Sequence, residues 1–176
     1  MSDAFFNYMP FYRFVAEIPH YRSYVEVGVY TGASCAFLAQ QLIFREKAFE
    51  LYAVDLWDKV NLETDYDRKI GTPIWNEFVD RLRREGLEER VKVLRMESAK
   101  AATEFEDGSV DFVFIDANHS YEHVKADIEA WRPKVRTGGL LSGHDYGEPC
   151  GVKQAVDELL AGQISLMGTC WYTFIR

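Results

Sequence analysis

The sequence has no long apolar segment and few cysteines, and each shortage argues against a class of protein. No apolar run approaches the roughly 20 residues that cross a bilayer. The N-terminus carries an acid and lacks a basic stretch before an apolar one, so we expect no signal peptide. Three widely spaced cysteines (Cys35, Cys150, Cys170) favour a reducing compartment over a disulfide framework. We therefore expect a cytoplasmic protein without a membrane partner.

Positive charge is also scarce, which bears on the partners of the chain. The 20 Lys and Arg residues are outnumbered by 28 Asp and Glu residues, and the net charge is −8 at pH 7. Nucleic-acid binding relies on clustered basic residues. The densest basic cluster (Arg81, Arg83, Arg84) lies among acids and is typical of a solvated helix face. We expect no nucleic-acid partner.

The composition is that of a folded domain. The 176 residues are 48% hydrophobic and 15% aromatic, enough for one sizeable core. Neither a repeat nor a linker rich in Pro, Gly and Ser divides the chain. We expect a single domain over residues 1–176, with an N-terminal helical segment in residues 1–20.

Predicted strands and helices alternate, which favours an α/β fold. Strands are predicted at 23–28, 49–55, 91–96, 110–115 and 140–143, followed by two short strands at 164–167 and 170–175. Helices are predicted at 4–17 with a break near Pro10, at 33–47, 74–85 and 99–105, from a Ser120 cap to Trp131, and at 151–161. Pro133 and Gly138-Gly139 are expected to form the turn that follows the helix ending at Trp131. The polar connection at 56–73 is long, which is typical of a functional or mobile segment.

The segment from Tyr24 to Ser34 is the most informative in the chain. It predicts a buried strand carrying Glu26, a turn with Gly28 and Gly32, and then a helix. Glycines allow tight turns and close approach to a ligand, and the free amides of a helix start point at that turn. This pattern predicts a small-molecule site at the end of a parallel strand.

Ionisable or polar residues lie at or just after the end of each of five predicted strands. They are Glu26, Asp55, Glu97 with Ser98, Asp116 with His119, and His144 with Asp145. Such groups are costly to bury without a use, and the carboxyl ends of parallel strands meet at one edge of a sheet. The sequence therefore predicts one functional site at that edge.

The turn and the second strand together indicate which ligand binds. Asp55 lies 27 positions after Gly28, where a carboxylate can accept both hydroxyls of a ribose. The turn lacks the G-x-G-x-x-G pattern of a dinucleotide site, since Val29 and Tyr30 stand where small residues are needed. Glu26 would repel a diphosphate. These features favour an adenosine ligand with a positive charge and no phosphate, namely S-adenosylmethionine.

At this point the chain resembles the class I methyltransferases, whose first motif is an acid, one residue, a glycine, three residues and a glycine. Glu26 to Gly32 matches this motif. The segment from Phe114 to Trp131, followed by Gly138-Gly139 and His144-Asp145-Tyr146, resembles the small-molecule branch called methyltransferase family 24. The resemblance covers roughly residues 22–176. It implies a three-layer, Rossmann-like α/β fold with a seven-stranded, mostly parallel sheet whose last strand runs antiparallel.

The resemblance also implies the cofactor site. The glycine turn would approach the methionine moiety, Asp55 would bind the ribose, Glu97 and Ser98 would lie near the adenine, and Asp116 would sit at the methionine end. The predicted cofactor-binding residues are Glu26, Gly28, Tyr30, Thr31, Gly32, Ser34, Asp55, Leu56, Glu97, Ser98 and Asp116. Ser98 could alternatively do no more than begin a helix.

The predicted catalytic residues are Asp116, His119, His144 and Asp145. An alcohol acceptor must lose its proton to a general base or through metal coordination. Metal-dependent relatives place ligands at the positions of Asp116, His144 and Asp145, but His144 stands where an acid is usual. A histidine suits a softer divalent metal better than magnesium. A metal-free site with His144 or His119 as base is the alternative, and His119 could also be a structural turn residue.

The resulting functional hypothesis is S-adenosylmethionine-dependent O-methylation of a small hydroxyl-bearing metabolite, with a sugar as one candidate. The alternatives are a cofactor-binding protein of the hydroxylase-like branch and a non-catalytic binding module. The acceptor pocket would come from residues 1–20, from residues 56–73 or from a partner subunit. The N-terminal aromatic residues favour core packing or a subunit contact, which makes a homodimer a further expectation.

Overall fold

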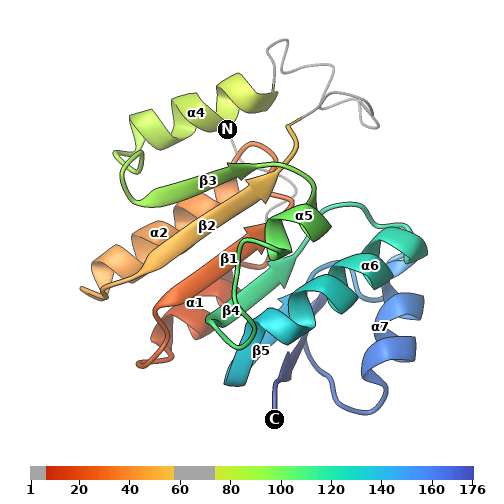
Figure 1. Cartoon of the computed structure of the whole chain (residues 1–176). Coiled ribbons are helices and arrows are strands. Elements are labelled where there is room, and N and C mark those ends of the chain that lie inside the picture. The colour runs from red at the N-terminus through yellow and green to blue at the C-terminus, as the bar shows by residue number, and fades with distance from the viewer. Residues whose placement is uncertain (1–6, 58–73) are drawn as a thin grey trace.

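The computed structural model describes residues 7–57 and 74–176, whose strands form one seven-stranded sheet in the order β3-β2-β1-β4-β5-β7-β6 (Figure 1). The strands are β1 Ser23–Val27, β2 Glu50–Asp55, β3 Val91–Arg95, β4 Val110–Ile115, β5 Val135–Gly143, β6 Ser165–Met167 and β7 Cys170–Phe174. All neighbouring pairs from β3 to β5 are parallel, whereas β7 is antiparallel to both β5 and β6. The expected mostly parallel sheet with an antiparallel last strand is confirmed.

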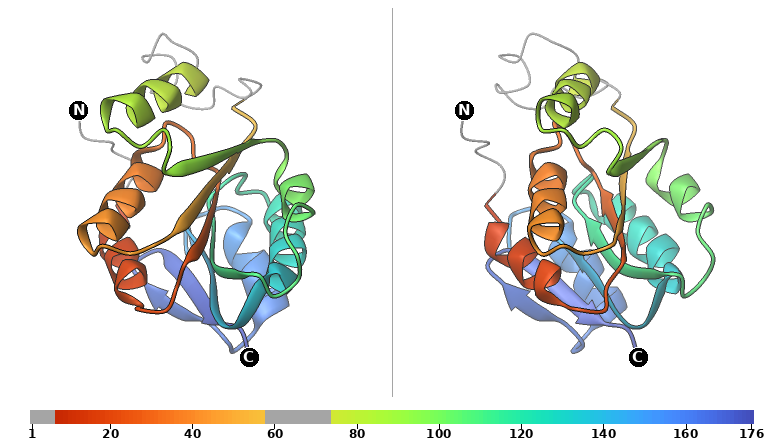
Figure 2. Two further views of the ribbon diagram at one scale, coloured as in Figure 1. Left: turned by 60° about the vertical axis from the view of Figure 1, so that its left-hand side comes forward. Right: turned by 90° about the vertical axis from the view of Figure 1, so that its left-hand side faces the viewer.

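Helices cover both faces of the sheet (Figure 2). They are α1 Met9–Glu17, α2 Ala33–Phe44, α4 Ile74–Arg84, α5 Ser98–Ala102, α6 Tyr121–Trp131, the 3-10 turn η1 Arg132–Lys134 and α7 Val152–Leu160. Successive side chains of a strand point to opposite faces. Phe112 and Phe114 of β4 accordingly belong to the core under α1 and α2, while Val113 and Ile115 belong to the core under α6 and α7. The fold has the expected three layers.

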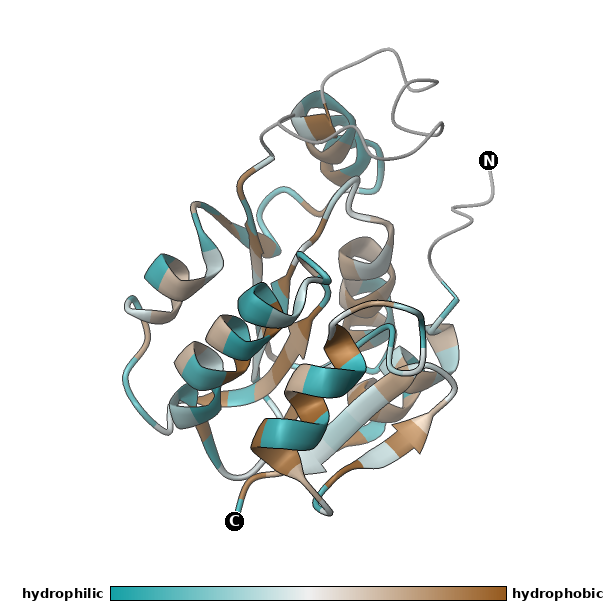
Figure 3. Ribbon diagram, turned by 90° about the vertical axis from the view of Figure 1, so that its right-hand side faces the viewer, coloured by the Kyte–Doolittle hydropathy of each residue, from teal (hydrophilic) through white to brown (hydrophobic). Residues whose placement is uncertain are grey.

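Helices α6 and α7 are amphipathic, as Figure 3 shows. Val124, Ile128 and Trp131 of α6 are buried, at the spacing that predicts a core-facing stripe. In α4 the buried residues are Phe78 and Leu82. Within the described ranges, no helix is long and apolar enough to cross a membrane.

The N-terminal helix differs from the prediction in the role of its proline. Pro10 lies in the first turn of α1 and does not break the helix. The first turn needs no backbone donor at that position, so proline is favoured there. Phe11 and Tyr12 are almost fully buried, so the aromatic segment packs into the core of this chain. Residues 4–6 of the predicted helix lie outside the described residues.

The fifth strand is longer than predicted, because Gly138 and Gly139 lie within β5 and do not form a turn. The pairing of β4 with β5 shifts register between Val110 and Phe112, so the glycine segment is a bulge. Gly138 has a φ of +75°, and a Cβ at Gly139 would lie 2.9 Å from the carbonyl oxygen of Asp111. The bulge therefore requires both glycines.

Other element boundaries agree with the predictions to within about three residues. Ser120 precedes α6 as expected, but its hydroxyl contacts Nδ1 of His123 at 2.7 Å and caps no backbone amide. All three cysteines are free, and Cys35 and Cys170 are buried. Of the predicted connection at 56–73, residues 58–73 lie outside the described part of the chain.

Candidate functional site

The ends of three adjacent strands are held together by backbone hydrogen bonds that continue past the strands. The Gly28 amide donates to Val54 O at 2.9 Å, and the Asp116 amide donates to Val27 O at 2.7 Å. Gly28 has a φ of +86°, and a Cβ there would lie 2.1 Å from the backbone oxygen of Asp116. Gly28 is therefore needed for the close contact between the first loop and the end of β4.

Glu26 is a fully buried acid beside this loop. One of its carboxylate oxygens accepts a hydrogen bond from the Ser34 hydroxyl. The other, Oε2, accepts no hydrogen bond of ordinary geometry from the described residues. Burial raises the pKa of Glu26 to about 8, although the hydroxyls of Ser34 and Tyr12 oppose this shift. A buried carboxylate that pairs with no cation is costly unless a ligand supplies the positive charge.

Asp55 fixes the conformation of the same loop from the end of β2. Its Oδ2 accepts a hydrogen bond from the Tyr30 amide at 2.9 Å, and its Oδ1 accepts one from the Trp57 amide at 2.8 Å. Tyr30 and Trp57 both have a positive φ, of 54° and 50°. Such backbone is strained in residues other than glycine and persists only where its surroundings hold it. The amides of Val29 and Leu56 also bond to this carboxylate, whose pKa is raised by burial against these hydrogen bonds.

Helix α4 braces the loop from outside, a role that no sequence motif indicated. Arg81 Nε donates to Thr31 O at 2.9 Å, and a Cβ at Gly32 would lie 2.6 Å from the ring of Phe78. The Trp57 ring stacks on Phe78 with centroids 4.6 Å apart. These contacts connect α4 to the loop after β1 and to the residues after β2, the two segments that carry most of the predicted cofactor-binding residues.

The residues after β3 and β2 expose both a charged and an apolar side chain. Glu97 is exposed at the start of α5, and Leu56 is 43% exposed after β2. The Ser98 hydroxyl accepts a hydrogen bond from Trp131 Nε1 at 2.9 Å and is also bonded to Asp127. The side chain of Ser98 is therefore directed at α6 and joins the two helices.

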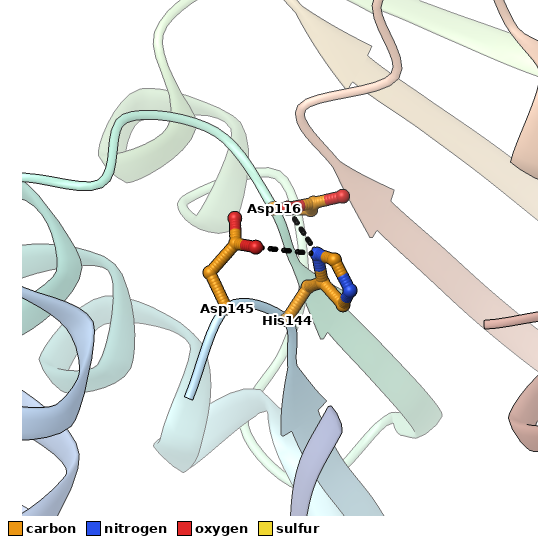
Figure 4. Close-up of side chains that lie close together, drawn as sticks. All are labelled: Asp116, His144 and Asp145. Atoms are coloured by element: carbon orange, nitrogen blue, oxygen red, sulfur yellow. Dashed lines mark ion pairs between the residues drawn. The ribbon is translucent and has the colours of Figure 1, made fainter. Parts of the chain in front are cut away.

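Asp116, His144 and Asp145 converge at the ends of β4 and β5 (Figure 4). Nδ1 of His144 lies 3.0 Å from Asp145 Oδ1 and 3.7 Å from Asp116 Oδ1. Asp145 has a φ of +59°, which turns the chain sharply after β5. One ligand atom from each residue lies within 4.8 Å of the others, so the three could hold a metal ion.

His119 joins this cluster from the loop after β4. Its Nε2 lies 3.1 Å from Asp145 Oδ2 and 3.6 Å from Asp116 Oδ1, and its side chain is 48% exposed. The four predicted catalytic residues thus lie together, two acids with two histidines. We refer to Asp116, His119, His144 and Asp145 as the acid–histidine cluster.

The charges of the acid–histidine cluster shift its pKa values in opposite directions. Burial alone would lower the pKa of His144, but hydrogen bonds to Asp116 and Asp145 raise it to about 9. Interaction with Asp116 likewise raises the pKa of His119. Burial would raise the pKa of Asp116, yet both histidines hold it below its usual value. At neutral pH the cluster therefore pairs the charged Asp116 carboxylate with a charged His144 ring.

Three further polar side chains reach the cluster, and sequence reasoning missed all of them. The Tyr8 hydroxyl donates to Asp116 Oδ2 at 2.9 Å. Nε2 of His144 lies 3.0 Å from Asn7 Oδ1 and 2.7 Å from Thr169 Oγ1. No local pattern marks these residues, because they come from the segment before α1 and from the turn between β6 and β7.

This sheet order, with a glycine turn after β1 and acids after β2 and β4, defines the class I methyltransferase fold. A family model described as a methyltransferase domain, that of methyltransferase family 24, matches residues 25–146. The chain belongs to this family.

Comparisons with individual proteins agree with the fold. The chain is 29% identical over 145 residues to an uncharacterized protein of Sinorhizobium fredii, y4gI, covering 81% of this chain but only 15% of that protein's length. The O-methyltransferase NovP superposes with a TM-score of 0.75 at 19% identity, covering 96% of this chain and 79% of NovP. CalS11, a TDP-rhamnose 3′-O-methyltransferase of calicheamicin biosynthesis, gives a TM-score of 0.63 at 16% identity, covering 95% and 76%. At these identities the two structures show the fold alone.

Proposed function

We propose that this chain transfers a methyl group from S-adenosylmethionine to a hydroxyl group of a small metabolite. Its membership of methyltransferase family 24 supports the reaction class and implies the cofactor. The observation that carries the proposal is the fully buried Glu26 carboxylate, which meets the hydroxyls of Ser34 and Tyr12 but forms no ion pair with any described residue. The ammonium group at the amino-acid end of the cofactor would supply the missing positive charge, which lowers the pKa of Glu26 and favours its ionised form.

The residues around the first loop fit the rest of the cofactor. We place the ribose hydroxyls against the Asp55 carboxylate, beside the exposed side chain of Leu56. We propose that Glu97 and the backbone at Ser98 face the adenine, since the Ser98 hydroxyl is already bonded within the protein. We place the methionine end against Gly28, Ser34 and Asp116. Tyr30, Thr31 and Gly32 complete the loop.

S-adenosylmethionine, when bound, supplies a methyl group on a positively charged sulfur, which an oxygen nucleophile attacks in line. The contribution of the protein is to hold the acceptor in line and to remove its proton. The acid–histidine cluster lies where that proton must leave. A neutral histidine could accept it directly, either His119 or the fraction of His144 that has lost its own proton. Alternatively Asp116, His144 and Asp145 could hold a divalent metal, which would lower the pKa of a bound hydroxyl.

A sugar is the first candidate for the acceptor. This choice rests on the structural likeness to CalS11, which acts on TDP-rhamnose. We propose a small molecule as the only substrate partner and the cytoplasm as the location. A homodimer also stays a proposal, although the aromatic residues of α1 that suggested it are buried within the chain.

Calorimetry with S-adenosylhomocysteine, the demethylated product, tests the cofactor site directly. We expect wild-type protein to bind it at micromolar concentration and Glu26→Gln to bind at least 10-fold more weakly, because the amide cannot ionise to pair with the ligand ammonium group. Glu50→Gln is the matched control, since Glu50 is an exposed acid at the start of β2 that pairs with Lys92.

Methyl transfer is then measured from labelled S-adenosylmethionine to a panel of nucleotide sugars and phenols. A methyl ether on one of these acceptors supports the proposal. Absence of any cofactor binding would overturn it, and so would equal binding by wild type and Glu26→Gln. Binding without transfer to any acceptor would favour the non-catalytic alternative.

A further inference from the structure

Two of the residues that reach the acid–histidine cluster hold one nitrogen of His144. The other ring nitrogen, Nδ1, faces Asp145 and Asp116. Nε2 faces Asn7 Oδ1 at 3.0 Å and Thr169 Oγ1 at 2.7 Å. An amide oxygen only accepts a hydrogen bond, whereas a hydroxyl can donate or accept. Nε2 therefore has a partner whether it carries a proton or not, and the ring orientation is fixed in either state.

The third residue, Tyr8, fixes Asp116 in the same way. Its hydroxyl occupies Oδ2 of the carboxylate, which leaves Oδ1 to face His119 and His144. The Tyr8 side chain is only 6% exposed, and its ring lies 4.6 Å from the His144 ring and 4.9 Å from that of Phe114. Tyr8 thus contacts both an acid and a histidine of the cluster.

The elements that carry these residues are themselves anchored to the sheet. Phe11 of α1 packs against Phe114 of β4, with ring centroids 5.8 Å apart. The turn between β6 and β7 is held because Thr169 O accepts a hydrogen bond from the Tyr146 amide at 3.0 Å. Residues 7, 8 and 169 all lie outside the matched range 25–146. Elements from both ends of the chain therefore meet over the cluster.

We propose that Asn7, Tyr8 and Thr169 are positioning residues, which orient His144 and Asp116 for the reaction without touching the reacting atoms. Outer residues that orient a catalytic or metal-binding group commonly change activity or affinity by about 10- to 100-fold when removed. The predicted effect on turnover rests on the proposed function. The orientation of the His144 ring does not, and it can be measured separately.

The kinetic test uses single-group deletions and matched controls. Tyr8→Phe and Thr169→Val each remove one hydroxyl, and Thr169→Ser restores it. Tyr21→Phe removes a hydroxyl that donates to Gly138 O at the same 2.9 Å, and Thr103→Val removes one that bonds locally to Lys100 O. We expect kcat to fall about 10-fold or more in Tyr8→Phe and Thr169→Val, with KM for the cofactor within twofold. Thr169→Ser and the two controls should stay near wild type.

The second readout needs no turnover. Nitrogen-15 NMR of the histidine side chains reports the hydrogen bonding and tautomer of each ring. The His144 Nε2 signal should move in Thr169→Val and Asn7→Ala, return in Thr169→Ser, and stay in place in Thr103→Val. An unchanged His144 signal in both deletions would overturn the proposal even if the chain proves to be an active methyltransferase. A shifted signal in a chain without transferase activity would support the positioning contacts while overturning the proposed function.

Discussion

The Tyr8 hydroxyl donates a 2.9 Å hydrogen bond to Asp116 Oδ2, between residues 108 positions apart in the sequence. The other oxygen of Asp116 lies 3.7 Å from His144 Nδ1 and 3.6 Å from His119 Nε2. The two oxygens of one carboxylate thus have separate partners. This division leaves Oδ1, together with His144 and Asp145, directed at a shared point.

The presence of histidine at that point predicts which metal the cluster prefers, if it holds one. Imidazole nitrogen suits zinc, cobalt and related transition ions, whereas magnesium prefers oxygen ligands. We expect Co²⁺ to bind at least 10-fold more tightly than Mg²⁺ in calorimetric titrations, with a visible absorption band for bound Co²⁺.

The control for this prediction is another histidine close by. His144→Ala should lose the absorption band, while His123→Ala should keep it, because His123 is exposed on α6 and contacts Ser120. Equal affinity for the two ions would contradict the preference, and an unaltered band in His144→Ala would contradict the ligand assignment.

A second prediction compares the loss of stability on replacing Gly28 and Gly86 by alanine. The comparison separates the cost of a strained backbone from the cost of a steric clash. Both have a positive φ, of +86° and +66°, but a Cβ at Gly28 would meet Asp116 O at 2.1 Å while one at Gly86 would meet nothing within 4 Å. Left-handed backbone costs a residue such as alanine about 1–2 kcal/mol. Overpacking adds about 1–3 kcal/mol.

Urea unfolding should therefore show a loss of about 1 kcal/mol in stability for Gly86→Ala and of about 3 kcal/mol or more for Gly28→Ala. Similar losses in the two variants would mean that the loop and the end of β4 can separate at little cost. The close approach of Gly28 to Asp116 would then not be essential to the fold.

The strand ends illustrate what the sequence predicts well. Glu26, Asp55, Asp116 and Asp145 each lie at or near the end of a strand, and parallel strands place such residues at one edge of the sheet regardless of the loops between them. The gathering of the acid–histidine cluster was predictable for this reason. The orientations of the side chains of Asp116 and His144 were not predictable, because they depend on Tyr8 and Thr169, which lie far away in the sequence.

The predictions for Pro10, for Gly138-Gly139 and for Ser98 differ from the structure for physical reasons that can be named. Pro10 fits both a break and a first turn, and only its packing decides between them. Gly138 and Gly139 predict a turn from composition alone, yet they form a bulge because β4 and β5 continue to pair on both sides. Ser98 fits both a helix start and a ligand contact. Its hydroxyl instead accepts a hydrogen bond from the buried Trp131, which is 33 positions away and could not be identified as its partner from the local sequence.

Arg81 provides a third prediction, on the brace that α4 gives to the cofactor loop. Its Nε donates to Thr31 O at 2.9 Å, and its side chain is 14% exposed. Arg81→Met should weaken binding of S-adenosylhomocysteine about fivefold or more, because the loop loses this contact. Calorimetry measures the change.

Arg83→Met is the matched control on the same helix. Arg83 is 63% exposed and pairs only with other surface groups in the described part of the chain, Asp80 and Glu88. Exposed ion pairs of this kind contribute little. If both variants bind the ligand as tightly as wild type, α4 does not hold the loop in its binding conformation.

Asp127 predicts how stability depends on pH at a place remote from the acid–histidine cluster. This acid of α6 is 6% exposed, and burial raises its pKa from 3.8 to about 6, against a hydrogen bond from Ser98. Between pH 4 and 6 the folded chain keeps a proton that the unfolded chain has released, so the free energy of unfolding falls as pH rises. Two pKa units correspond to about 2–3 kcal/mol.

Asp127→Asn keeps an acceptor for Ser98 but cannot ionise. Relative to this variant, wild type should lose about 2–3 kcal/mol between pH 4 and pH 7 in urea unfolding, and the difference should stay constant above pH 7. Asp80→Asn serves as the control, since Asp80 lies on the surface of α4 and should leave the pH dependence unchanged. Parallel curves for wild type and Asp127→Asn would mean that the buried carboxyl ionises at its ordinary pKa, and that α6 admits enough water to solvate it.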